Sequence, residues 1–108
     1  MPGQRYLWHG APTVIMIFKD VRGISNPDLD CGIAGQNMAL TAHSMGLGTC
    51  WVGWFKEQPV RELLGIPEAL RVVAITPLGY PAQEPRPRPR KALQKIAFAN
   101  TWGQPLEE

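Results

Sequence analysis

The sequence predicts an α+β fold, with a small mixed sheet around one long central helix. Thr13 to Phe18 is a continuous apolar run rich in β-branched residues, typical of a strand covered on both faces, and Val72 to Leu78 predicts a second strand. A helical pattern lies between them, from about Pro27 to Met45. Because two strands form only a marginal sheet, we expect dimerisation to complete it. The 108 residues allow one domain, with residues 81–108 as an extended C-terminal arm.

Both ends of the long helix carry local signals. Asn26 is a favoured N-cap residue, and Pro27 fits the first helical position, where no amide hydrogen is needed. Gly46 suits a left-handed residue after the helix, and Leu47 is the hydrophobic residue that follows it in a Schellman motif. These residues predict the limits of the helix.

The helix has apolar residues on two sides. One side is a narrow stripe of small residues, namely Cys31, Gly35, Ala39, Ala42 and Gly46. The opposite side collects larger residues, namely Ile33, Leu40 and Leu47. This pattern predicts a helix buried between two layers, and the most buried element of the fold. We expect the small-residue stripe to meet the same helix of a second subunit across a two-fold axis. The alternative is that both sides pack within the helix's own domain.

Two shorter elements follow the long helix. Thr49 to Phe55 is apolar and aromatic, and predicts a brief strand or an ordered loop. Pro59 then opens a short helix, Val60 to Leu64, which ends at Gly65 in another C-cap pattern.

Prolines determine the last third of the chain. Pro77 removes a hydrogen-bond donor near the end of the second strand, so we expect one-sided pairing there. The stretch from Pro81 to Pro89 is rich in proline and predicts an extended, polyproline-like crossing. It leads to a short helical pattern, Lys91 to Asn100.

Composition argues against several classes of protein. The net charge is only +2, so we expect no nucleic-acid partner. No apolar run approaches the roughly 18 residues of a membrane span, and the opening residues lack the pattern of a signal peptide. We therefore expect a cytoplasmic protein without a membrane partner.

The two cysteines are predicted to be buried, reduced thiols. Cys31 and Cys50 lie at opposite ends of the long helix, too far apart for the roughly 7 Å between Cα atoms that a disulfide allows. With two histidines and no C-x-x-C motif, the sequence offers no metal site.

Four motifs occur in order along the chain: GLGTCW, ELLGIP, LGYP, and an R-K-x-L tail with a Trp-Gly close. Together they resemble the C-terminal part of the FMN-dependent nitroreductase family, from about Ala11 to Gly103. The family's N-terminal flavin-binding segment has no counterpart here, so the resemblance covers a partial domain. It implies a homodimer that uses FMN and NAD(P)H to reduce nitroaromatic or quinone-like acceptors.

The resemblance assigns two groups of residues to FMN. Trp51, Val52, Gly53 and Trp54 correspond to the family's loop along the flavin ring, with the amide of Gly53 or its neighbour aimed at N5. The alternative is a tight turn under a tryptophan-rich surface.

Arg88 and Arg90 correspond to the family's basic residues at the FMN phosphate, with Lys91 beside them, and a guanidinium suits that oxygen fork. The alternatives are a solvated basic tail, or contact of the RPRPRK stretch with nucleic acid or an acidic peptide.

No set of catalytic side chains is visible. His43 and Ser44 are adjacent on a helix and face different directions. A flavoenzyme needs no such set, because the cofactor carries the hydride chemistry. The competing hypothesis is a shortened chain without flavin that acts as a non-enzymatic dimerisation subunit. Because the N-terminal segment is missing, we expect FMN to bind weakly or not at all in the isolated chain.

Overall fold

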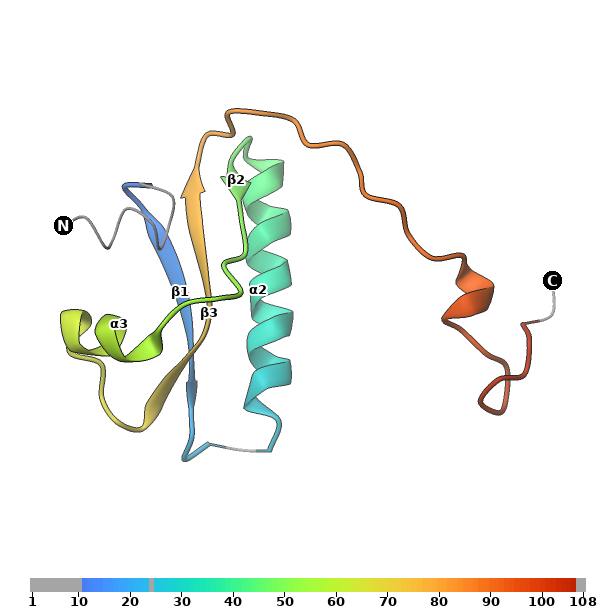
Figure 1. The fold of residues 1–108 in the computed structure, drawn as a ribbon, viewed down its shortest axis with the longest axis horizontal. Coiled ribbons are helices and arrows are strands. Elements are labelled where there is room, and N and C mark those ends of the chain that lie inside the picture. Colours follow the sequence, from blue (N-terminus) through green and yellow to red (C-terminus); the bar gives the residue numbers. More distant parts are fainter. Residues whose placement is uncertain (1–10, 24, 107–108) are drawn as a thin grey trace.

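A computed structural model describes residues 11–23 and 25–106 of the chain. The described residues form an α+β fold, as expected (Figure 1). In chain order its elements are β1 (Val14–Asp20), α2 (Pro27–Ser44), β2 (Gly48–Thr49), α3 (Glu57–Leu64), β3 (Leu70–Gly79) and the short 3-10 helix η1 (Leu93–Lys95).

The sheet has three strands in the order β1-β3-β2. β3 pairs antiparallel with β1, from Val14 opposite Pro77 to Asp20 opposite Leu70, and antiparallel with β2 on its other side. All strand pairs among the described residues are antiparallel, so the expectation of a mixed sheet is wrong. The helical connection through α2 does make β1 and β2 run in the same direction, but β3 lies between them.

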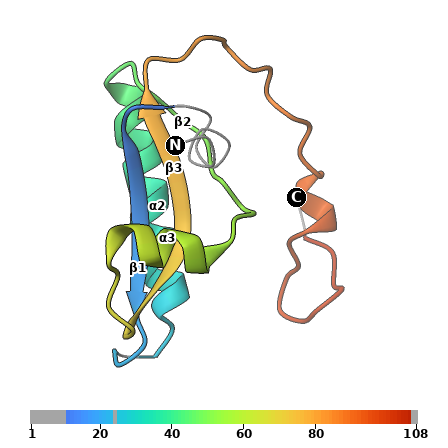
Figure 2. The same ribbon diagram turned by 60° about the vertical axis from the view of Figure 1, so that its left-hand side comes forward.

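The two longer helices cover opposite faces of the sheet (Figures 1 and 2). Ile17 of β1 points toward α2, where its Cδ1 lies 3.1 Å from the place that a Cβ on Gly35 would take. The neighbouring β1 side chains point the other way and pack around Val60 of α3, with Val72 and Ile75 of β3. The core therefore lies mainly between the sheet and α3.

The ends of α2 agree with the sequence signals. Asn26 is the N-cap, although its side chain makes no capping hydrogen bond; its backbone is left-handed, with φ 65°. At the other end Gly46 has φ 78°. The Gly46 amide donates to His43 O at 3.0 Å and the Leu47 amide to Ala42 O at 2.9 Å. These two bonds define the predicted Schellman motif.

The small-residue side of α2 faces the chain's own sheet. Its buried members are Cys31, Gly35 and Ala42. The prediction that this stripe meets a second subunit is therefore wrong, because the absence of large side chains lets the sheet and its loop approach the helix. The opposite side is open: Leu29, Ile33 and Leu40 are each more than half exposed. The most buried element is β3, whose Ile75 and Thr76 are 0% and 1% exposed.

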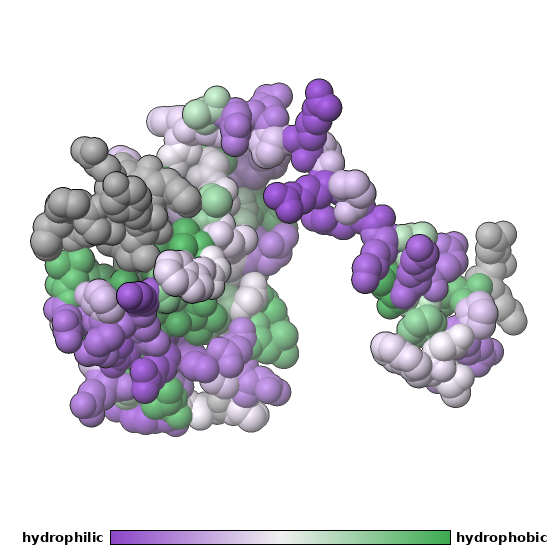
Figure 3. Space-filling model, in the orientation of Figure 1, coloured by the Kyte–Doolittle hydropathy of each residue, from purple (hydrophilic) through white to green (hydrophobic). Residues whose placement is uncertain are grey.

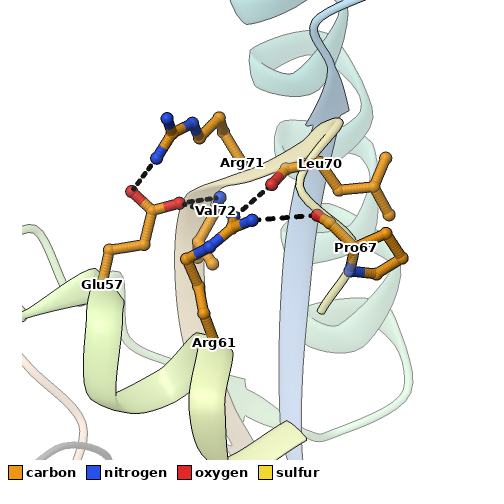
Figure 4. Close-up of polar contacts among 6 residues, drawn as sticks. All are labelled: Glu57, Arg61, Pro67, Leu70, Arg71 and Val72. Atoms are coloured by element: carbon orange, nitrogen blue, oxygen red, sulfur yellow. Dashed lines mark hydrogen bonds and ion pairs between the residues drawn. The ribbon is translucent and has the colours of Figure 1, made fainter. Parts of the chain in front are cut away.

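A polar cluster ties α3 to the start of β3 (Figure 4). The Val72 amide donates to Glu57 Oε1 at 3.0 Å. Arg61 lies 3.3 Å from the same oxygen and also donates to the carbonyls of Pro67, at 2.9 Å, and Leu70. Its side chain is only 10% exposed. α3 begins two residues before the expected Pro59, at Glu57, and this carboxylate fixes the first turn.

After β3 the chain leaves the body as an arm (Figures 1 and 2). Its proline-rich stretch is extended, as expected, and each of its residues is exposed. The surface of the arm is mainly hydrophilic (Figure 3). The helix expected over 91–100 is reduced to the single turn η1. A positive φ of 62° at Asn100 and the packing of Phe98 against Trp102, with ring centroids 4.9 Å apart, give this region a turn instead.

Both cysteines are free. Cys31 is buried and its thiol donates to Phe18 O, whereas Cys50 is exposed, so the expectation of two buried thiols holds for Cys31 only. Cys50 is exposed because it begins the loop after β2. Within residues 11–23 and 25–106, none of the helices has the length and apolar character to cross a membrane.

Candidate functional site

The loop from β2 to α3 runs alongside β3. β2 places Gly48 opposite Gly79 and Thr49 opposite Leu78. The same register returns at Val52, which bridges to Ile75 through a hydrogen bond from the Val52 amide to the Ile75 carbonyl at 2.8 Å. The expected alternatives, a brief strand or an ordered loop, are thus combined: two paired residues, then a loop pinned at one further point.

Between these paired positions the register sets Cys50 opposite Pro77. Because Pro77 has no amide hydrogen, the ladder loses a donor here, on the side that faces β2. On the other side the Leu78 amide still donates to Thr13 O at 3.0 Å. The one-sided pairing expected at Pro77 is confirmed. The Cys50 amide donates instead to the hydroxyl of Thr76, at 2.8 Å.

Trp51 packs on α2 over Gly35. A Cβ on Gly35 would lie only 2.9 Å from Trp51 Cη2, closer than side chains tolerate. The absence of a side chain at Gly35 therefore makes room for the indole. The sequence reasoning identified Gly35 as one of a small-residue stripe but did not connect it with Trp51.

The next residues of the loop point outward. Trp54 is 82% exposed, and no atom of residues 11–23 or 25–106 lies within 4 Å of the place that a Cβ on Gly53 would take. Neither the Gly53 nor the Trp54 amide donates a hydrogen bond to another described residue. Among the residues that the structure describes, the loop thus presents unpaired backbone donors beside a glycine and an exposed aromatic ring.

The structure does not bring Arg88 and Arg90 to this loop. Both lie on the exposed, extended part of the arm, which leads away from the body (Figure 1). Neither arginine is in an ion pair within the described part of the chain. Within one chain, the two groups of candidate FMN residues are therefore separate.

The described residues offer no conventional catalytic group near the loop. His43 and Ser44 are exposed, and the Ser44 hydroxyl donates to Thr41 O at 2.7 Å. The carboxyl groups with lowered pKa values lie elsewhere: hydrogen bonds from Arg22 lower the pKa of Asp20 to about 2, and the Val72 amide lowers that of Glu57. No group of His, Cys, Asp and Glu suited to a metal ion occurs among residues 11–23 and 25–106.

Comparison with known proteins identifies relatives of this chain. The model of the nitroreductase family matches residues 1–80. The NADPH-flavin oxidoreductase of Vibrio harveyi is 38% identical over 76 residues, which are 68% of this chain and 32% of that protein. The oxygen-insensitive NADPH nitroreductase of Salmonella typhimurium is 33% identical over 82 residues, covering 74% of this chain and 34% of the relative.

Solved structures agree with the sequence relatives. The FMN-dependent nitroreductase of Clostridium difficile R20291 superimposes with a TM-score of 0.72 at 27% identity, over 84% of this chain and 59% of that chain. The chain spans about a third of the length of the first three curated relatives it matches. The match of residues 1–80 to the family model covers well over half of the sequence, and the chain belongs to the nitroreductase family.

Proposed function

We propose that this chain is a flavin oxidoreductase that reduces nitroaromatic or quinone-like acceptors with NAD(P)H, through FMN. The observation that carries the proposal is the anchored loop of residues 50–54, which presents Gly53 and Trp54 outward. Relatives of this chain are named as NADPH-flavin oxidoreductase and NADPH nitroreductase. NAD(P)H as reductant also favours the cytoplasm as its location.

The residues present fit the edge of a flavin ring. At Gly53 no side chain blocks the approach of a planar group to the backbone. The amides of Gly53 and Trp54, which have no partner among the described residues, are donors for ring nitrogen and carbonyl acceptors. Trp51 and Val52 hold the preceding backbone against the body. When bound, FMN would supply the hydride chemistry, and the protein would supply position and electrostatics.

We further propose that the phosphate is held by Arg88 and Arg90 of a second copy of the chain. The arm carries these guanidinium groups away from its own body, and the longest dimension of the described chain is 55 Å. The exposed side of α2, with Leu29, Ile33 and Leu40, offers an apolar contact for that copy. In such a homodimer, the loop of one subunit and the arm of the other meet at one FMN.

A second candidate function is a dimerisation subunit that holds no flavin. It is favoured by the separation of the loop from Arg88 and Arg90 within one chain. FMN binding decides between the two functions.

The test is a titration of the purified chain with FMN, followed by flavin fluorescence. We expect weak, saturable binding that is lost in the double variant Arg88→Ala, Arg90→Ala. The matched control is Arg86→Ala with Lys95→Ala, which removes the same charge from the same exposed arm. Equal loss in both variants would show a general charge effect, and no uptake by the wild type would support the flavin-free subunit.

A further inference from the structure

A side-chain hydroxyl takes the place of a direct backbone hydrogen bond between β3 and the loop. The Cys50 amide donates to Thr76 Oγ1 at 2.8 Å, and Thr76 Oγ1 donates in turn to the carbonyl of Pro77 at 3.0 Å. In a regular ladder the amide of Cys50 would reach the Pro77 carbonyl directly, since the register sets these residues opposite each other. Here the hydroxyl is inserted between donor and acceptor.

The inserted hydroxyl is placed where the ladder is weakest. Pro77 supplies no donor to this edge, so a direct pair between Cys50 and Pro77 would hold at most one hydrogen bond. Thr76 is 1% exposed, and its oxygen accepts from the Cys50 amide and donates to the Pro77 carbonyl. The hydroxyl therefore fixes how far the backbone at Cys50 stands from β3.

The position of Cys50 determines where the rest of the loop runs. The next fixed points are the indole of Trp51 over Gly35 and the hydrogen bond from Val52 to Ile75. These three successive anchors leave Gly53 as the first unpinned residue. A shift at the first anchor would change the direction in which the outward amides point.

We propose that Thr76 is a positioning residue for the flavin-edge loop, acting through the amide of Cys50. The inference rests on the proposed function, because it assigns to this loop the contact with FMN. Thr76 itself is buried under the loop, so it acts on the ligand only through the backbone it holds.

Two substitutions separate the hydroxyl from the shape of the side chain. Thr76→Val keeps the volume and the β-branch but removes the oxygen, whereas Thr76→Ser keeps the oxygen. We expect Thr76→Val to weaken FMN binding by about five- to tenfold, the size expected for loss of one hydrogen bond. Thr76→Ser should stay within about twofold of the wild type, because its oxygen keeps the hydrogen bond. Thr76→Ala provides a second variant without the oxygen if valine prevents folding.

A control separates positioning from general stability. Cys31→Ala removes a buried thiol of α2 that donates to the Phe18 carbonyl, away from the three anchors, and should lower the melting temperature without changing FMN affinity. Amide hydrogen exchange of Cys50, measured by NMR without FMN, should be faster in Thr76→Val than in Thr76→Ser.

The outcomes of these experiments are distinct. Wild-type affinity in Thr76→Val overturns the role of Thr76, and so does equal loss in Thr76→Val and Cys31→Ala. If the wild-type chain takes up no FMN, the proposed function fails, and the exchange of the Cys50 amide still shows whether the hydroxyl anchors the loop.

Discussion

Gly35 of α2 and Trp51 of the loop fit together because one has no side chain and the other has the largest. A Cβ on Gly35 would lie 2.9 Å from Cη2 of the indole and 3.1 Å from Cδ1 of Ile17. The close approach brings the loop onto the helix at the point where the loop leaves β2. The small residues of α2 therefore serve contacts inside the chain.

Gly35→Ala should displace the indole of Trp51. Overpacking of a filled contact costs about 1 to 3 kcal/mol, whereas replacing a helical glycine with alanine stabilises by up to about 1 kcal/mol. The expected result is a net loss of stability in urea unfolding, with a shift in tryptophan fluorescence.

Gly32→Ala is the matched control for this substitution. Gly32 lies on the exposed side of the same helix, and nothing lies within 4 Å of the place that its Cβ would take. Gly32→Ala should raise the free energy of unfolding by about 1 kcal/mol through helix propensity alone. Equal stability of the two alanine variants would show that Trp51 does not depend on Gly35.

The limits of α2 could be predicted because they depend on neighbouring residues. Pro27 at the first turn and Gly46 with φ 78° after the last are local requirements of the backbone. Which side of the helix faces the sheet could not be predicted in the same way. Its sequence gives two apolar sides, and contacts distant in sequence, such as those of Gly35 with Ile17 and Trp51, decide which of them meets the sheet.

The positioning of the loop also depended on contacts distant in sequence. Pro77 indicated a missing backbone donor, and the sequence also shows Thr76 beside it, whose hydroxyl can form a hydrogen bond in place of the missing one. That its hydroxyl accepts from Cys50, 26 residues away, needed the strand register. In the arm, Leu93 and Ile96 are each 60% exposed, so the expected helix has no surface to pack on and forms a single turn.

Glu57 should make the stability of the chain depend on acid pH. The hydrogen bond from the Val72 amide is the main cause that lowers the pKa of Glu57 below 4.5, with the charges of Arg71 and Arg61 adding to it. Because the pKa is lower in the folded state, the stabilisation is complete above about pH 4.5 and is lost as the pH falls through the folded-state pKa. Glu57→Gln should reduce this dependence in urea unfolding measured from pH 6 to 3.

Glu62→Gln is the comparison for this pH series. Glu62 lies on the same helix and accepts a hydrogen bond only from Gln58, among the described residues. The Glu62→Gln substitution should leave the slope of stability against pH almost unchanged. Asp20, whose pKa is lowered to about 2 by hydrogen bonds from Arg22, is present in every variant. Differences in pH dependence between the variants therefore come from α3. An unchanged slope in Glu57→Gln would contradict the role of the Val72 hydrogen bond.

Arg61→Lys should destabilise α3 although it keeps the positive charge. The guanidinium donates to the carbonyls of Leu70 and Pro67 and pairs with Glu57, an arrangement that a single ammonium group does not reproduce. Loss of two such bonds should lower the free energy of unfolding by about 2 kcal/mol. Arg71→Lys is the control, because Arg71 is 54% exposed and lies 3.9 Å from Glu57. Similar losses in the two variants would show that charge alone holds the cluster.

Ile33→Glu should dissociate the proposed homodimer. Ile33 is 55% exposed on the side of α2 that faces away from the sheet, next to Leu29 and Leu40 along the helix. A carboxylate buried there without a partner would weaken the association by at least about tenfold, while the folded monomer tolerates a charge on an exposed face. Gln58→Glu adds the same charge at an exposed polar position of α3, on the other face of the sheet, and should leave the association unchanged. Sedimentation velocity over a range of concentrations measures both variants. Because the loop and the arm would then no longer meet, Ile33→Glu should also lose FMN binding. A wild-type chain that sediments as a folded monomer at micromolar concentration would refute the shared site.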